Sequence, residues 1–112
     1  MAIVNADYSN LSFEDMAASI GLKPKHIPML IGSFLEEAGP IISNMKIAVA
    51  SSNYPDLKLH SHSIKGSAGN LKFIEIYDMA REIELSASES NVDFDYASYI
   101  GAIEKAVATI PN

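Results

Sequence analysis

The chain has 112 residues, 48% of them apolar and 20% charged, a composition typical of one globular domain and too apolar for a disordered chain. Its 14 acidic and 8 basic side chains give a formal net charge of −6, which argues against nucleic-acid binding because phosphate contacts require a basic face. Cysteine is absent, which excludes disulfides and thiol chemistry, and the sequence contains neither a membrane-length apolar run nor a recognisable secretory signal. We therefore expect a cytoplasmic protein.

Apolar residues recur at helical spacing along almost the whole chain. The first expected helix is short: it begins after Ser12, which forms a variant of the capping box with Asp15, and it ends at Gly21. A second and longer helix is expected over 27–49. Its apolar stripe keeps its phase across Gly39-Pro40, which favours one kinked helix over two separate helices.

Three more helices are expected, at about 55–71, 73–87 and 96–110. A polar turn precedes the first of them, and Pro55 is compatible with its first turn. We predict an all-α fold in one domain spanning 1–112, an up-down-up-down four-helix bundle with the short additional N-terminal helix at one end. Periodicity leaves an irregular orthogonal helical domain open. Four methionines are expected in the core: Met16, Met29, Met45 and Met79.

The expected helix over 55–71 differs from the others. On a helical wheel its buried edge consists of Leu57, Ile64, Ala68 and Leu71. The opposite face carries His62, Gly66 and Gly69, with Phe73 beside them if the helix continues. No acidic residue lies between Leu57 and Ile74, and a basic stripe repeats every seven residues at Lys58, Lys65 and Lys72.

This pattern points to His62 as a reactive residue. Neutral imidazole is a usable nucleophile that forms covalent intermediates, and Lys65, three residues later, can reach an anion attached to the ring. Each glycine inside a helix costs about 1 kcal/mol relative to alanine, which indicates that something approaches this backbone closely. The face therefore supplies the acceptor's half of a phosphoryl transfer, and the metal, nucleotide site and carboxylate pocket would belong to a partner.

The segment from His62 to Leu71 resembles the signature of histidine-containing phosphotransfer (HPt) domains, H-x-x-K-G followed by small residues. The resemblance extends to 34–40 and 80–84 in the flanking helices. It implies a four-helix bundle in which His62 is phosphorylated, Lys65 stabilises the phosphoryl group and Gly66 gives clearance for a docking receiver domain. The chain departs from the family pattern at Lys72 and at His60-Ser61, outside H-x-x-K-G.

We expect the docking surface for this partner to surround His62. Its members would be Lys58, Leu59, Gly66, Gly69, Lys72 and Phe73. Alternative interpretations stay open: the glycines suit close packing between helices, the lysines suit a solvated helix face, and the two large apolar residues suit the core.

The function expected from these features is that of a phosphorelay intermediate. His62 would accept a phosphoryl group from a receiver-domain aspartate, or from a sensor histidine kinase (hybrid kinases included), and pass it to another receiver aspartate. Because no glycine-rich phosphate loop is present, the chain would be a phosphoryl carrier without a nucleotide site or cofactor, with magnesium on the receiver. We expect a monomer. The alternatives are a non-phosphorylated adaptor that uses the same helix face and a substrate domain of a histidine kinase.

Metal-dependent and hydrolytic chemistry are not expected. His60 and His62 project about 200° apart on a helix, so they do not share one ion, and no acidic residue nearby in the sequence supplies a further ligand. His60 is expected near the core edge and His26 at the surface. No serine–histidine–acid set or pair of carboxylates suggests a hydrolase.

Overall fold

The computed structural model describes residues 3–112, which contain five α-helices, one 3-10 turn and no strand. The predicted all-α class is confirmed. The elements are α1 (Phe13–Ile20), η1 (Pro24–His26), α2 (Ile27–Ala50), α3 (Tyr54–Asn70), α4 (Ile74–Ser88) and α5 (Tyr96–Ala108). None of the described helices is long and apolar enough to span a membrane.

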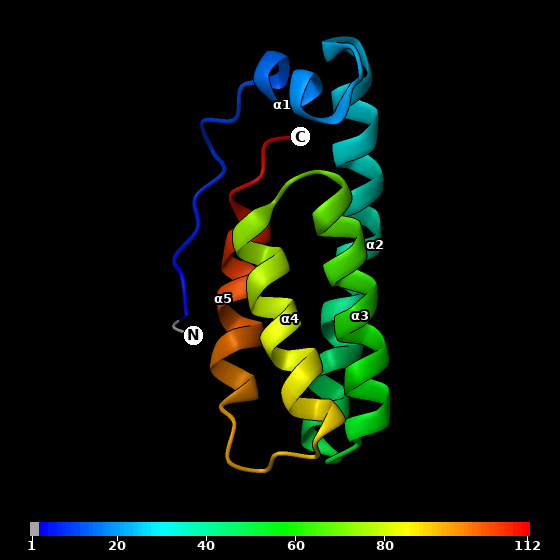
Figure 1. Ribbon diagram of the computed structural model, residues 1–112, viewed down its shortest axis with the longest axis vertical. Helices are drawn as coiled ribbons and strands as arrows, with labels where there is room; N and C mark the ends of the chain where they lie inside the picture. Colours follow the sequence, from blue (N-terminus) through cyan, green and yellow to red (C-terminus); the bar gives the residue numbers. More distant parts are fainter. Residues whose placement is uncertain (1–2) are drawn as a thin grey trace.

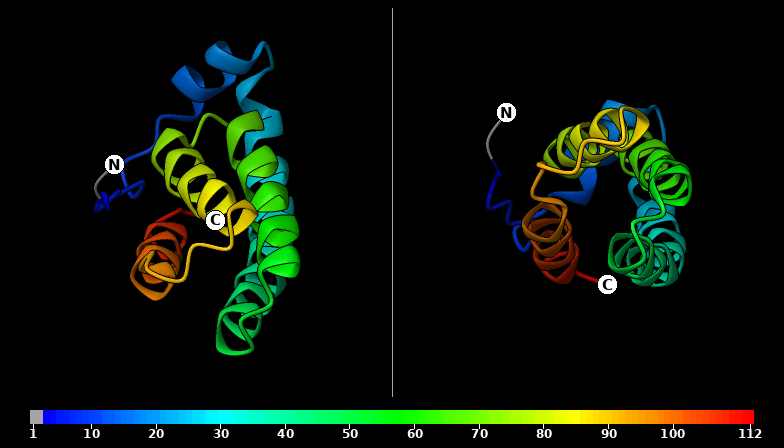
Figure 2. Two further views of the ribbon diagram at one scale, coloured as in Figure 1. Left: turned by 60° about the horizontal axis from the view of Figure 1, so that its bottom comes forward. Right: turned by 90° about the horizontal axis from the view of Figure 1, so that it is seen from below.

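The four long helices lie side by side along the long axis of the molecule (Figure 1). Viewed from below, they surround a common centre, with α2 beside α3, α3 beside α4, and α5 closing the ring between α4 and α2 (Figure 2). The short α1 lies across one end of this bundle (Figure 1). The α3–α4 pair is the most closely packed of these neighbours, and this pair positions the candidate site.

Local capping accounts for the helix limits. The Ser12 hydroxyl accepts the Asp15 N–H at 3.2 Å, and α1 ends at Gly21, whose φ of 74° lies in the left-handed region that glycine favours. The predicted continuity of the second helix is confirmed, since α2 runs unbroken through Pro40. At the start of α3, the Asn53 side chain accepts the N–H of Asp56 and Pro55 occupies the first turn.

The predicted buried edge of α3 is confirmed: Leu57, Ile64 and Ala68 have no exposed surface, and Leu71 is buried just after the helix. Three of the four methionines expected in the core are buried: Met16, Met45 and Met79. The prediction for Met29 is wrong, because its side chain is 66% exposed in the first turn of α2. Its neighbour Ile27 is fully buried there instead.

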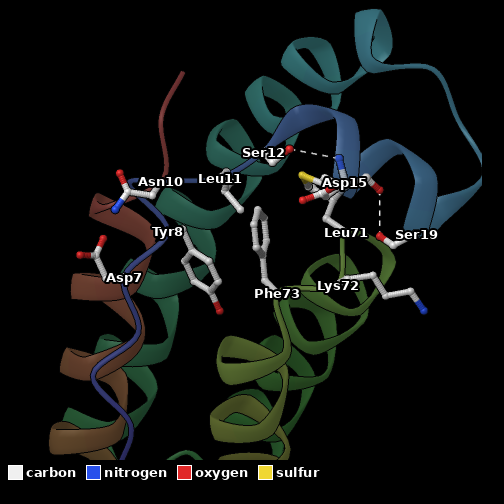
Figure 3. A pocket seen from close by; sticks show the side chains of 11 residues that line it. Asp7, Tyr8, Asn10, Leu11, Ser12, Asp15, Ser19, Leu71, Lys72 and Phe73 are labelled. Carbon is white, nitrogen blue, oxygen red and sulfur yellow. Dashed lines mark hydrogen bonds between the residues drawn. The ribbon is translucent and has the colours of Figure 1, made fainter.

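The prediction that Phe73 contributes to an exposed docking surface is wrong. The helix ends at Asn70, and Lys72 adopts a positive φ of 62° that turns the chain back toward the bundle. Phe73 then becomes the residue before α4 and is 1% exposed. Its ring packs against Tyr8 and Phe34, with centroid distances of 4.8 and 5.3 Å. Figure 3 shows this ring between Tyr8 and Leu71.

The same turn removes Lys72 from the basic stripe. Lys72 lies outside α3 and lines a hollow shared with α1 and the N-terminal segment (Figure 3). The stripe along α3 therefore consists of Lys58 and Lys65 alone.

The segment before α1 is attached to the bundle through Tyr8. Its backbone N–H donates to Thr109 Oγ1 at 2.8 Å, after α5, and its hydroxyl donates to Glu75 Oε1 at 2.6 Å in α4. Burial, together with the Glu75 carboxylate, raises the pKa of Tyr8 above its ordinary value of 10.0. The Tyr8–Phe73 contact thus links the N-terminal segment to the α3–α4 turn.

We predict that Phe73→Ala lowers the free energy of unfolding by about 3–5 kcal/mol, because it leaves a cavity at this junction. Ile74→Ala is the matched control. Ile74 is the next residue along the chain but is 50% exposed, so its replacement is expected to cost less than about 1 kcal/mol. Urea unfolding followed by circular dichroism measures both. Equal losses for the two variants would contradict the placement of Phe73.

Candidate functional site

His62 stands on the outer side of α3, and its side chain is 66% exposed. The opposite side of the helix is fixed in the core by Leu57 and Ile64, so the imidazole is held at the surface by the burial of the other face. Between them, Ser61 is fully buried and its hydroxyl donates to the Leu57 carbonyl at 2.6 Å. The expectation of an outward-facing histidine is confirmed.

A carboxylate from the next helix contacts the ring. Glu84 Oε2, in α4, lies 2.7 Å from His62 Nδ1, and Glu84 Oε1 lies 2.6 Å from Lys65 Nζ. Glu84 therefore bridges the two residues that the sequence singled out. The stretch between Leu57 and Ile74 contains no acidic residue, and the acid that contacts His62 comes instead from α4.

The environment of Glu84 keeps it ionised. Its side chain is only 13% exposed, and this burial by itself raises the pKa of the carboxyl. Hydrogen bonds from Lys65 and His62, together with the positive charge of Lys65, outweigh burial and hold the pKa of Glu84 below its ordinary value of 4.5. At neutral pH the carboxylate accepts both hydrogen bonds.

This contact determines which imidazole nitrogen is free to react. An ionised carboxylate only accepts hydrogen bonds, so Nδ1 of His62 carries the proton. In the neutral ring, Nε2 then holds the lone pair. The site thus presents a nucleophilic nitrogen with its partner nitrogen anchored, an arrangement suited to accepting an electrophile from outside the protein.

The two glycines of α3 have different surroundings. A Cβ atom at Gly66 would meet nothing within 4 Å, so the surface one turn beyond His62 is open. A Cβ at Gly69 would lie 3.1 Å from Tyr77 Cδ2 of α4. Gly69 therefore fits the alternative interpretation as a close-packing position, whereas the open surface at Gly66 is consistent with a surface for a partner.

Beside His62, on the side toward the N-terminal end of α3, the surface contains a hollow. A shallow groove of about 410 Å³ is lined by Pro55, Lys58, Leu59, His62 and Glu84. Of the residues predicted to form the docking surface, Lys58, Leu59 and Gly66 thus lie on the exposed side of α3 with His62. Lys72 and Phe73 do not lie on this side of α3, because the helix ends at Asn70 and Phe73 is buried.

The remaining histidines stay outside this site. His60 is half-buried on α3, and His26 is half-buried at the start of α2. Among residues 3–112 no three histidine or carboxylate side chains are grouped closely enough to hold a metal ion.

A comparison with protein families supports what the geometry suggests. The family model described as "Hpt domain" matches residues 29–110, which is most of the chain and includes α3, α4 and the contact between them. The chain belongs to the Hpt domain family. The resemblance carried by His62 to Leu71 is thereby confirmed. No curated protein and no solved structure matches the chain.

Family membership gives the general function. Hpt domains are phosphocarrier modules without nucleotide sites, and they act in phosphorelay signalling through receiver domains and histidine kinases. Residues 3–28, which include α1 and η1, lie before the matched region. The role of each residue in this Hpt domain stays a prediction.

We predict that Gly66→Ala and Gly69→Ala change stability in different ways. Alanine at Gly66 meets open space and improves helix propensity, so the free energy of unfolding is expected to rise by about 0.5–1 kcal/mol. At Gly69 the same gain is opposed by the contact with Tyr77, so the change is expected to be smaller or negative. Urea unfolding of both variants tests this difference, and an equal gain at both positions would contradict it.

We also predict that Glu84 makes the free energy of unfolding depend on pH below pH 4.5, the ordinary pKa of its carboxyl group. Because the folded-state pKa is lowered, the stabilisation is present above pH 4.5 and is lost as the pH falls through the folded value. Glu84→Gln is expected to cost about 1 kcal/mol at pH 7 and less at pH 3. Unfolding measured from pH 3 to 7 gives this difference, and parallel curves for the two proteins would contradict the bridging role of Glu84.

Proposed function

We propose that this Hpt domain is a phosphorelay intermediate that carries its phosphoryl group on Nε2 of His62. The donor is the phosphoaspartate of a receiver domain or a sensor histidine kinase, and the acceptor is the aspartate of another receiver domain. The observation that carries the proposal is the exposed imidazole whose Nδ1 is bound by an ionised carboxylate. Membership of the family supports the same chemistry.

Transfer of the phosphoryl group from a phosphoaspartate to His62 needs no additional group to accept or supply a proton. The Nε2 lone pair of His62 attacks phosphorus, an Nε2–P bond forms, and the O–P bond of the donor phosphoaspartate breaks, which releases a free aspartate carboxylate. Nδ1 keeps its proton, so the phosphorylated ring becomes positively charged. Glu84 lies 2.7 Å from Nδ1 and stabilises that charge. The onward transfer is the reverse reaction with a second aspartate.

Lys65 compensates the charge that the phosphoryl group brings. A phosphoryl group adds a charge of about −2 to the face that already holds the Glu84 carboxylate. Lys65 binds Glu84 at 2.6 Å and is three residues from His62 on the same helix, so its ammonium is within reach of both anions. Lys58, on the groove beside His62, adds a second cation.

The remaining features of the proposal concern the protein as a whole. We infer a single domain over 1–112, an up-down-up-down bundle of α2 to α5, a monomer and a cytoplasmic location. The short connections at 51–53 and 71–73 and the course of the chain in Figure 1 support the bundle topology. Magnesium would belong to the receiver, and the carrier itself would need no cofactor.

His62→Gln tests the carrier function. Glutamine keeps size and polarity but has no nucleophilic nitrogen, so incubation with a phosphorylated receiver domain is expected to leave acid-labile phosphate on the wild type and none on the variant. His60→Gln is the matched control, two residues away and half-buried, and it is expected to accept phosphate normally.

Two outcomes would favour the alternatives. If His62→Gln keeps both receiver binding and downstream signalling, the chain is an adaptor that uses this helix face without phosphorylation. If the wild type is labelled only by a histidine kinase with ATP and by no phosphorylated receiver, it is a kinase substrate domain.

A further inference from the structure

The groove next to His62 has a mainly apolar wall exposed to solvent. Leu59, which forms part of that wall, is 61% exposed although it is a large aliphatic residue, and Pro55, one turn earlier, is also exposed. Both residues lie on the N-terminal side of His62, whereas Gly66 lies on the C-terminal side. The surface around the imidazole is therefore asymmetric, with a hollow on one side and open space above Gly66 on the other.

Nδ1 of His62 and the carboxylate of Glu84, which both line the groove, are already bound to partners. His62 Nδ1 and one oxygen of Glu84 bind each other, and the second oxygen of Glu84 binds Lys65. A polar side chain entering here would lose its hydration without gaining a free partner from this pair, whereas an apolar one would bury the Leu59 and Pro55 surfaces. The groove therefore favours an apolar occupant.

A cation lies on the same groove. Lys58 is exposed and forms no ion pair with any other residue between 3 and 112, unlike Lys65. An unpaired cation beside an apolar hollow complements a surface on which an apolar side chain has an acidic neighbour. Because His62 and Glu84 belong to both the groove and the phosphorylation site, any protein that reaches Nε2 also approaches the groove.

We propose that this groove holds one apolar side chain of the receiver domain, next to an acidic group that faces Lys58, and that Leu59 thereby selects among receiver domains. This inference rests on the proposed function, since the occupant is the phosphorylation partner. It assigns the two sides of His62 different tasks: the Leu59 side supplies recognition, and the Gly66 side supplies clearance.

Leu59→Ser, with Ile47→Ser as its matched control, tests the proposal. Ile47 is 65% exposed on α2, so its replacement removes a similar amount of exposed apolar surface away from the groove. With a receiver domain that phosphorylates the wild type, Leu59→Ser is expected to weaken receiver binding about tenfold, and Ile47→Ser to leave it unchanged. Direct labelling by phosphoramidate, a small phosphodonor that needs no docking, is expected to be equal in all three proteins.

A footprint makes the test independent of any loss of affinity. Since the chain contains no cysteine, Leu59→Cys and Ile47→Cys each introduce a single thiol. Saturating receiver domain is expected to slow alkylation of the thiol at position 59 several-fold and not to affect the thiol at position 47.

The outcomes separate the two proposals. If phosphoramidate and receivers both fail to label wild-type His62, the carrier function itself is wrong. If the wild type is labelled by a receiver, but Leu59→Ser binds it as tightly as Ile47→Ser does and the thiol at position 59 is alkylated at the same rate with and without receiver, the groove is not part of the interface.

Discussion

The geometry of the site depends on the register between α3 and α4. The connection at 71–73 is short, and the buried Phe73 ring fixes its position against Tyr8 and Phe34. His62 and Glu84 are each eleven residues from Phe73, and Gly69 and Tyr77 are each four residues from it. The His62–Glu84 contact and the approach of Tyr77 to Gly69, at two levels along the helix pair, therefore fit the same antiparallel register. A shift of that register by a single residue would separate the carboxylate from the imidazole.

The sequence predicted what depends on periodicity along one helix. The helix positions, the buried edge of α3 and the outward direction of His62 all follow from burial of one face, which a single chain segment reveals. Glu84 was missed because its role depends on which helix packs beside α3. The missing signal was the antiparallel symmetry about 71–73, which places residue 84 opposite residue 62.

The errors at Lys72 and Phe73 have one cause. Both assignments extended the helical wheel beyond Asn70, where the chain leaves the helix through a residue with positive φ. A non-glycine residue seldom adopts this conformation, so the usual sequence signal for the end of a helix was absent. Where glycine does end a helix, at Gly21, the prediction was correct.

The bridge through Glu84 is also compatible with the proposed transfer of an anionic group to an acidic protein. A phosphoryl group would be repelled by a bare carboxylate, but Glu84 is largely buried and neutralised by Lys65, and it contacts the ring on the nitrogen remote from Nε2. Its charge therefore acts on the imidazole more than on the incoming phosphate. In the proposed transfer the ring would gain a positive charge when Nε2 bonds to phosphorus, and the carboxylate would already be in place to stabilise it without rearrangement. One buried acid can thus favour the nucleophile before transfer and the charged ring after it, leaving the open side of the imidazole to the partner.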